Sequence, residues 1–97
     1  MKTVFIVCNQ GISRDVRDIL EEKGIRGFTR WQEIQGQGSE TGPPRMGTHT
    51  WPALNDAIMT VVPDDTATSL LKDLKALNEK LPHQGLRAFT WTVEDEV

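Results

Sequence analysis

The pattern of apolar and polar positions predicts four strands. Residues 3–8 and 57–62 are apolar on both faces, which is typical of strands in the middle of a sheet. In residues 27–34, β-branched and aromatic side chains alternate with charged and amide ones, so we expect a strand nearer an edge. Residues 86–93 alternate strictly between larger apolar and smaller or polar side chains, which predicts a half-buried strand.

The first predicted helix follows the first strand. Val16, Ile19 and Leu20 recur at helical spacing and form one apolar side. Ser13 stands one turn earlier, where a hydroxyl can cap the helix, and Gly24 stands where a left-handed residue can end it. A short amphipathic helix is expected here.

The second predicted helix is longer and follows the third strand. Asp65 or Thr66 is expected to cap it, and Pro82 and Gly85 are expected to end it. Its apolar stripe consists of Leu70, Leu71, Leu74, Leu77 and Leu81.

The element order is therefore βαββαβ, the ferredoxin-like arrangement of the α+β class. It predicts an antiparallel four-stranded sheet with both helices on one face, the first and third strands inside and the second and fourth outside. Two helices cannot cover Phe5, Val7, Trp31 and Trp91 as well as the other face of the sheet. We expect part of that aromatic surface to meet another subunit.

Residues 35–56 are the longest stretch without a strand or helix pattern. Loops longer than about 12–15 residues are uncommon in compact domains, and where they occur they are usually functional or disordered. Neither regular structure can run through the glycines and prolines of this stretch, which are Gly36, Gly38, Gly42, Pro43, Pro44, Gly47 and Pro52.

Composition narrows the class of protein. The 97 residues suit one domain spanning 1–97, and the net charge of −3, without clustered Lys and Arg, argues against a nucleic-acid partner. Cys8 is the only cysteine, so a reducing compartment is expected. No segment approaches the roughly 20 apolar residues that span a bilayer, so we expect a soluble cytoplasmic protein without direct membrane insertion.

Two stretches resemble the PII signal-transduction proteins, also called nitrogen regulatory proteins P-II. The run GIRGFTRWQEIQGQGSETG contains the turn Gly36-Gln37-Gly38, and the run IMTVVPDD follows the loop. In that family, a Gly-x-Gly turn at a strand end opens a long mobile T-loop. The resemblance covers residues 24–65 well and the flanking elements by topology.

The resemblance implies a homotrimeric regulator with a small-effector site in each cleft between subunits. It places effector binding at Gly36, Gln37, Gly38 and Ser39, with Arg87 as a nearby charge. The T-loop of such proteins docks on a regulated target, often a transporter, channel or enzyme. The partner-contacting residues of this loop would be Arg45, Met46, His49 and Trp51.

The chain also departs from the family pattern. It contains no tyrosine, which excludes uridylylation of a loop tyrosine, and Glu40 stands where a negative charge would repel phosphate. The family's second glycine-rich loop is replaced by LPHQG at residues 81–85, and EDEV replaces the basic residues after the last strand. These changes argue against the usual mode of ATP binding. An adenine nucleotide remains a candidate effector, because backbone N–H groups near Gly36 and Gly38 can bind an anion. Alternatively, these two glycines serve only to let the chain bend away from the sheet edge.

A transition-metal ion is the other candidate ligand. Met46, His49, His83 and Cys8 carry side chains that suit Cu(I) or Zn(II), and Met46 and His49 lie three residues apart. Some PII-like relatives are associated with heavy-metal efflux, which adds an analogy. The alternative function is therefore a metal-binding protein linked to metal transport.

The remaining aromatic and acidic residues have simpler interpretations. Trp51 lies in the loop and is expected either to anchor a partner or to fold back onto the third strand. Trp31 and Trp91 are expected in the core or at a subunit contact. Asp64 and Asp65 fit a helix start. No nucleophile stands at a recognisable spacing from a base, so we expect no catalytic activity.

Overall fold

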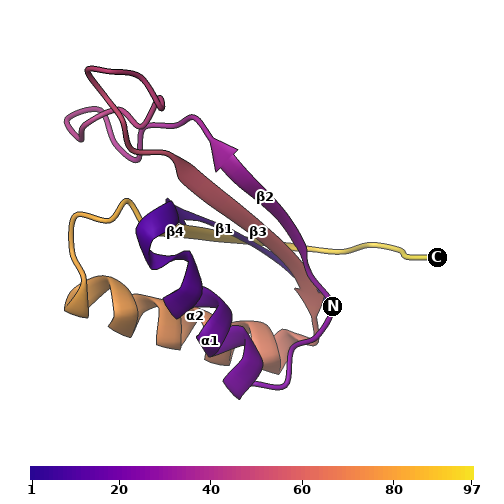
Figure 1. The fold of residues 1–97 in the computed structure, drawn as a ribbon. Coiled ribbons are helices and arrows are strands. Elements are labelled where there is room, and N and C mark those ends of the chain that lie inside the picture. Colours follow the sequence, from indigo (N-terminus) through magenta and orange to yellow (C-terminus); the bar gives the residue numbers. More distant parts are fainter.

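The computed structural model describes residues 1–97, and its elements follow the predicted order (Figure 1). The strands are β1 (Lys2–Asn9), β2 (Thr29–Ile34), β3 (Asn55–Val62) and β4 (Arg87–Thr92). The helices are the short 3₁₀ turn η1 (Gln10–Ile12), α1 (Ser13–Glu22) and α2 (Asp64–Lys80).

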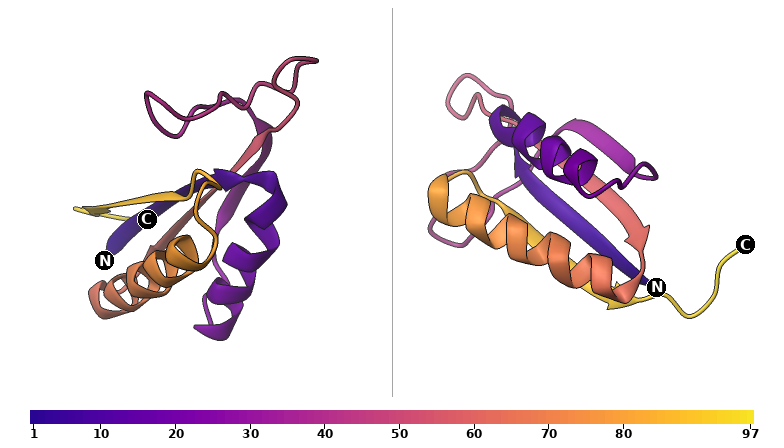
Figure 2. Two further views of the ribbon diagram at one scale, coloured as in Figure 1. Left: turned by 90° about the vertical axis from the view of Figure 1, so that its left-hand side faces the viewer. Right: turned by 90° about the horizontal axis from the view of Figure 1, so that it is seen from below.

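The four strands form one antiparallel sheet in the order β2-β3-β1-β4. β1 pairs with β3 on one side and with β4 on the other, and β2 pairs with β3. Both helices lie on the same face of the sheet (Figure 2). The ferredoxin-like prediction is confirmed, including β1 and β3 as the inner strands and β2 and β4 as the edges.

The core lies between the sheet and the two helices. Val4, Ile6 and Cys8 project from β1 toward the helices and are almost fully buried. They meet the buried sides of Val16 and Leu20 on α1. Burying one such aliphatic side chain contributes about 1.5–3 kcal/mol, so this layer is the main source of folding free energy.

The start of α1 differs from the sequence expectation. Asn9 caps η1, since its side-chain oxygen accepts a hydrogen bond of 3.0 Å from the Gly11 N–H. The chain then runs from η1 directly into α1, so Ser13 is the first helical residue rather than the cap. The predicted Ser13 cap is therefore wrong. Gly24, with φ of 70°, follows the helix end as expected.

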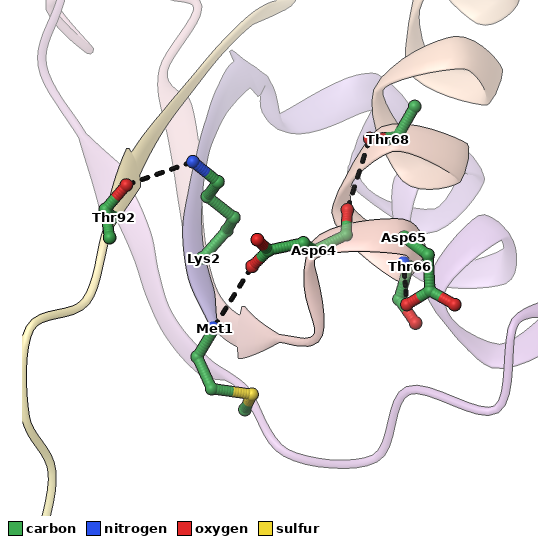
Figure 3. Close-up of polar contacts among 7 residues, drawn as sticks. All are labelled: Met1, Lys2, Asp64, Asp65, Thr66, Thr68 and Thr92. Atoms are coloured by element: carbon green, nitrogen blue, oxygen red, sulfur yellow. Dashed lines mark hydrogen bonds and ion pairs between the residues drawn. The ribbon is translucent and has the colours of Figure 1, made fainter.

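The start of α2 also lies earlier than expected (Figure 3). The helix begins at Asp64 after Pro63, which makes no side-chain cap, so the predicted cap at Asp65 or Thr66 is wrong. Asp65 lies inside the first turn, where its carboxylate accepts a hydrogen bond of 2.9 Å from the Thr66 N–H. Both aspartates add negative charge at the positive end of the helix dipole, which stabilises this end.

The sheet face opposite the helices carries a row of aromatic side chains across three strands. The Phe5 ring on β1 lies 6.2 Å from that of Trp31 on β2 and 6.4 Å from that of Trp91 on β4. Trp31, Trp91 and the neighbouring Phe89 remain more than two-fifths exposed within one subunit. Trp31 and Trp91 therefore lie outside the core, and the subunit-contact alternative for them stays a prediction.

Neither helix combines the length and the apolar character needed to cross a lipid bilayer.

The core can be tested with a matched pair of leucine substitutions on α2. Leu70 is fully buried, whereas Leu71 is only partly buried. We expect Leu70→Ala to lower the free energy of unfolding by about 2–5 kcal/mol. Leu71→Ala should cost less, as measured by urea denaturation at one fixed protein concentration. Equal losses at the two positions would contradict this packing.

Candidate effector site at the base of the long loop

The sheet topology brings three connections to one end of the molecule. Because β1 runs antiparallel to both β3 and β4, its end lies beside their beginnings. The Asn9 N–H donates a hydrogen bond of 2.9 Å to the Gln84 carbonyl in the α2–β4 connection. The Gln10 N–H donates one of 3.0 Å to the carbonyl of Leu54, at the end of the long loop. Segments distant in sequence therefore form one surface here.

The long loop spans residues 35–54 and is divided by a narrow neck. Gly36 and Arg45 form an antiparallel bridge with backbone hydrogen bonds of 2.9 Å and 2.6 Å. We call residues 37–44 the inner lobe and residues 46–54 the outer lobe. The two lobes are visible above the sheet in Figure 1.

The outer lobe is closed by its own tight turn. The Thr48 N–H donates a hydrogen bond of 2.9 Å to the Trp51 carbonyl, and the Trp51 N–H donates one of 3.1 Å to the Thr48 hydroxyl. Gly47 has φ of 65° and bonds through its N–H to the Ala53 carbonyl. The Trp51 side chain is 42% exposed, so within one subunit it remains open to contact.

The inner lobe forms one wall of a cavity of about 430 Å³. The lobe is held by the Gln37 side-chain amide, which donates a hydrogen bond of 2.8 Å to the Gly42 carbonyl, and by the Ser39 hydroxyl, which accepts one of 2.9 Å from the Gly42 N–H. The α2–β4 connection forms the facing wall. The lining residues are Gly38, Ser39, Thr41, Gly42, Pro43, Arg45, Asn78, His83, Gly85 and Leu86.

Arg45 is the charged residue of this cavity. It is 5% exposed, and its Nη2 donates a hydrogen bond of 3.2 Å to the His83 carbonyl. His83 adopts a left-handed backbone with φ of 73°, as does Gly85 with φ of 62°. A side chain at Gly85 would collide with the Arg45 guanidinium, so glycine is required for this approach.

Arg87 ties the inner lobe to the start of β4. Its Nη1 donates a hydrogen bond of 3.0 Å to the Gly38 carbonyl, and its guanidinium lies 5.5 Å from the centre of the Phe89 ring. A cation over an aromatic face gains a further modest attraction. Arg87 therefore stands at the base of the loop, on the side of the inner lobe.

Only some of the predicted effector-binding residues line the cavity. Gly38 and Ser39 line the cavity, Gly36 forms the neck, and Gln37 is engaged within the inner lobe. Glu40, expected to repel an anion, is not among the lining residues. The binding roles of these residues and of Arg87 stay predictions.

Of the ten lining residues, sequence reasoning assigned only Gly38 and Ser39 to the effector site. Arg45 was expected to contact a partner, yet it is buried against the α2–β4 connection. Asn78, His83 and Gly85 were not assigned to an effector site. The one available signal was the pair His83 and Gly85 directly after a helix-ending Pro82, which marks a loop of unusual backbone geometry.

The predicted metal ligands do not converge. The structure contains no group of three or more His, Cys, Asp or Glu side chains that could hold a metal ion. His83 lines the cavity, whereas Met46 and His49 lie on the outer lobe. Burial, reinforced by the Asp56 charge, raises the pKa of Cys8 to about 11, which disfavours the thiolate that a metal would need. The geometry thus gives the metal prediction no support.

An ion pair between the partly buried Arg30 and the buried Asp56 fixes the strand that leads into the loop. The Asp56 carboxylate accepts a hydrogen bond of 2.8 Å from Arg30 and one of 3.1 Å from the Glu33 N–H. Glu33 has φ of 57° and lies where the register of β2 shifts. Burial opposes ionisation, but the bonds from Arg30 and Glu33 outweigh it, so the pKa of Asp56 lies below its ordinary value.

A family model identifies the class of protein that this fold and loop define. The model described as "Nitrogen regulatory protein P-II" matches residues 1–97. The chain therefore belongs to the PII family, and the resemblance inferred from the sequence is confirmed. No curated protein matches the chain.

Solved structures of PII-like proteins share this fold. CPII, a nitrogen regulatory PII-like protein from Thiomonas intermedia K12, bound to ADP, AMP and bicarbonate, matches with a TM-score of 0.74 at 20% identity over 95% of this chain and 88% of that one. Its complex with ADP and bicarbonate gives 0.74 at 21% identity over 93% and 82%. A candidate PII-like signalling protein from Thermus thermophilus gives 0.67 at 22% identity over 95% and 85%. The chain is thus a divergent family member.

The Asp56 ion pair predicts a specific pH dependence. Because the pKa of Asp56 is lower in the folded chain than in the unfolded chain, its stabilisation is present above about pH 4 and is lost as the pH falls through the folded-state value. Asp56→Asn should lower the free energy of unfolding by about 3 kcal/mol at pH 7. The difference from the wild type should shrink in acid.

The matched control for this test is Asp18→Asn, which removes an exposed i,i+4 pair with Arg14. Such a pair contributes less than about 1 kcal/mol. Urea unfolding between pH 3 and pH 7 measures both variants. A difference for Asp56→Asn that stays constant over this range would contradict the ion-pair account.

Proposed function

We propose that this PII-family protein is a homotrimeric signalling protein that senses an adenine nucleotide at the cavity and controls a protein target through its long loop. The observation that carries the proposal is the cavity itself, which the inner lobe and the α2–β4 connection enclose on two sides with Arg45 in its wall. The role is regulatory rather than catalytic.

The chemistry of the cavity suits a phosphate-bearing ligand. Its volume of about 430 Å³ lies within the usual range for small-molecule sites. The lining includes one arginine and no carboxylate, together with the backbone of Gly38, where the lack of a side chain lets an anion approach closely. CPII, a PII-like protein of the same fold, has been solved with ADP, AMP and bicarbonate, which supports a nucleotide as the ligand class.

The aromatic sheet face supports the trimer. Phe5, Trp31 and Trp91 form an apolar row that α1 and α2 do not cover, and Phe89 extends it. Contiguous exposed aromatic surface of this kind is characteristic of subunit contacts. Packing three such faces together would also bring a neighbouring chain toward each open cavity and complete an effector site between subunits.

The outer lobe supplies the surface for the target. His49 and Trp51 are exposed, and Met46 is partly exposed. A large rigid aromatic side chain on a closed turn desolvates much area at low entropic cost, which suits a contact with a protein such as a transporter. Effector binding would shift the population of loop conformers and so change access to this surface.

A thermal-shift panel tests the effector class. Adenine nucleotides, bicarbonate and transition-metal ions are added separately to the metal-free protein. At about 100 times its Kd, a ligand that binds only the folded state adds about 2.7 kcal/mol, which raises the melting temperature by several degrees. We expect ADP or AMP to do so, and Gly38→Trp, which fills the cavity, to abolish the response. A response to a metal ion alone, lost in His49→Ala, would contradict the proposal in favour of metal binding.

A matched pair of tryptophan substitutions tests the trimer. Trp91 lies on the aromatic sheet face and Trp51 lies on the outer lobe, with similar exposure within one subunit. We expect Trp91→Lys to dissociate the trimer because it places a charge in the proposed interface. Trp51→Lys should leave the mass at three chains in sedimentation equilibrium. A wild-type monomer at micromolar concentration would overturn the trimer.

A further inference from the structure

Arg45 belongs to two parts of the molecule at once. Its backbone closes the neck with Gly36, and its side chain lies in the cavity wall against His83 and Gly85. The inner lobe lines the cavity, but no residue of the outer lobe does. Within the loop, Arg45 is therefore the junction between the cavity and the Trp51 turn.

Arg45 lacks an acidic partner for its positive charge. Arg45 as a residue is 5% exposed and its guanidinium forms no ion pair, unlike that of Arg30, which bonds to Asp56. One of its five N–H groups donates to the neutral His83 carbonyl at 3.2 Å. A buried cation without an acidic partner is costly, and an anion in the cavity would remove that cost.

A charged acceptor would compete with the His83 carbonyl. Hydrogen bonds between a guanidinium and a phosphate are stronger than those to a neutral oxygen and are often bidentate. The backbone of Arg45 bonds to Gly36 at 2.6 Å and 2.9 Å, so a ligand bound by the Arg45 side chain would contact the residue that closes the neck. The next residue, Met46, begins the outer lobe and bonds through its N–H to the Trp51 carbonyl at 3.4 Å.

We propose that Arg45 binds the phosphate portion of the effector and transmits occupancy of the cavity to the outer lobe through the Gly36–Arg45 neck. The nucleotide part of this inference rests on the proposed function. The anion-binding part depends only on the buried unpaired guanidinium. The α2–β4 connection has no lysine or arginine in residues 81–86, so Arg45 of the loop supplies the positive charge of the cavity instead.

The binding part is tested by titrating the full-length protein with ADP and, separately, with pyrophosphate in a calorimeter. Arg45→Gln removes the charge and keeps most of the side-chain length, and we expect it to weaken both ligands at least about tenfold. Arg14→Gln makes the same chemical change on the exposed side of α1 and should leave both affinities unchanged. The melting temperature of each ligand-free variant establishes that it is folded.

A second variant displaces Arg45 without changing its charge. A Cβ at Gly85 would occupy the space of the guanidinium, and the left-handed backbone there also disfavours alanine. Gly85→Ala should therefore weaken both ligands although every charge is retained. Full affinity in folded Gly85→Ala would contradict the placement of Arg45 as the binding residue.

The transmission part is tested by hydrogen exchange followed by mass spectrometry on peptides covering residues 46–54. In the wild type, we expect saturating ADP to change exchange of the Thr48 and Gly47 amides, which are bonded within the outer lobe. In Arg45→Lys, saturated with the same ligand, that change should be lost or reduced severalfold. An unchanged response in this variant would overturn the transmission role.

The outcomes separate the two proposals. If the wild type binds pyrophosphate but no nucleotide, the proposed effector class fails and the anion-binding role of Arg45 stands. If it binds ADP and Arg45→Gln binds ADP equally well, the inference about Arg45 fails and the proposed function stands. If the wild type binds neither ligand, both fail.

Discussion

The pairing of β1 with both β3 and β4 is the constraint on which the rest of the structure depends. It fixes the two inner strands in antiparallel directions, and it places the end of β1 and the starts of β3 and β4 at one end of the sheet. The long loop and the α2–β4 connection must then lie together. The cavity is a direct result of this topology, because each of its two walls is a connection that ends at this edge.

Two arginines at this end of the molecule, the partly buried Arg30 and the buried Arg45, differ in whether an acidic side chain neutralises them. Arg30 is neutralised by Asp56 and holds the bulged end of β2, so it fixes the direction in which the chain enters the loop. Arg45 has no acidic partner and faces the cavity. A satisfied ion pair makes a rigid support, whereas an unsatisfied buried cation makes a site that favours an anion.

The chain departs from the PII sequence pattern in the α2–β4 connection, and the structure shows what this departure changes. The α2–β4 connection contains no lysine or arginine in residues 81–86, yet its backbone at His83 and Gly85 still turns left-handed and approaches the loop closely. The positive charge comes instead from Arg45 on the opposite wall.

The sequence alone determined the element order, the inner strands and the length of the loop, because alternation, helical spacing and Gly/Pro content act over a few neighbouring residues. It was wrong at the helix starts, where Ser13 and Asp65 are good caps locally but the preceding 3₁₀ turn and Pro63 set the first helical residue. Only the tertiary structure decided that Arg45 is buried, that His83 lines a cavity without a metal cluster, and that Trp51 is exposed. These outcomes depend on contacts between segments far apart in the chain, such as that of Arg45 with His83, which no local pattern records.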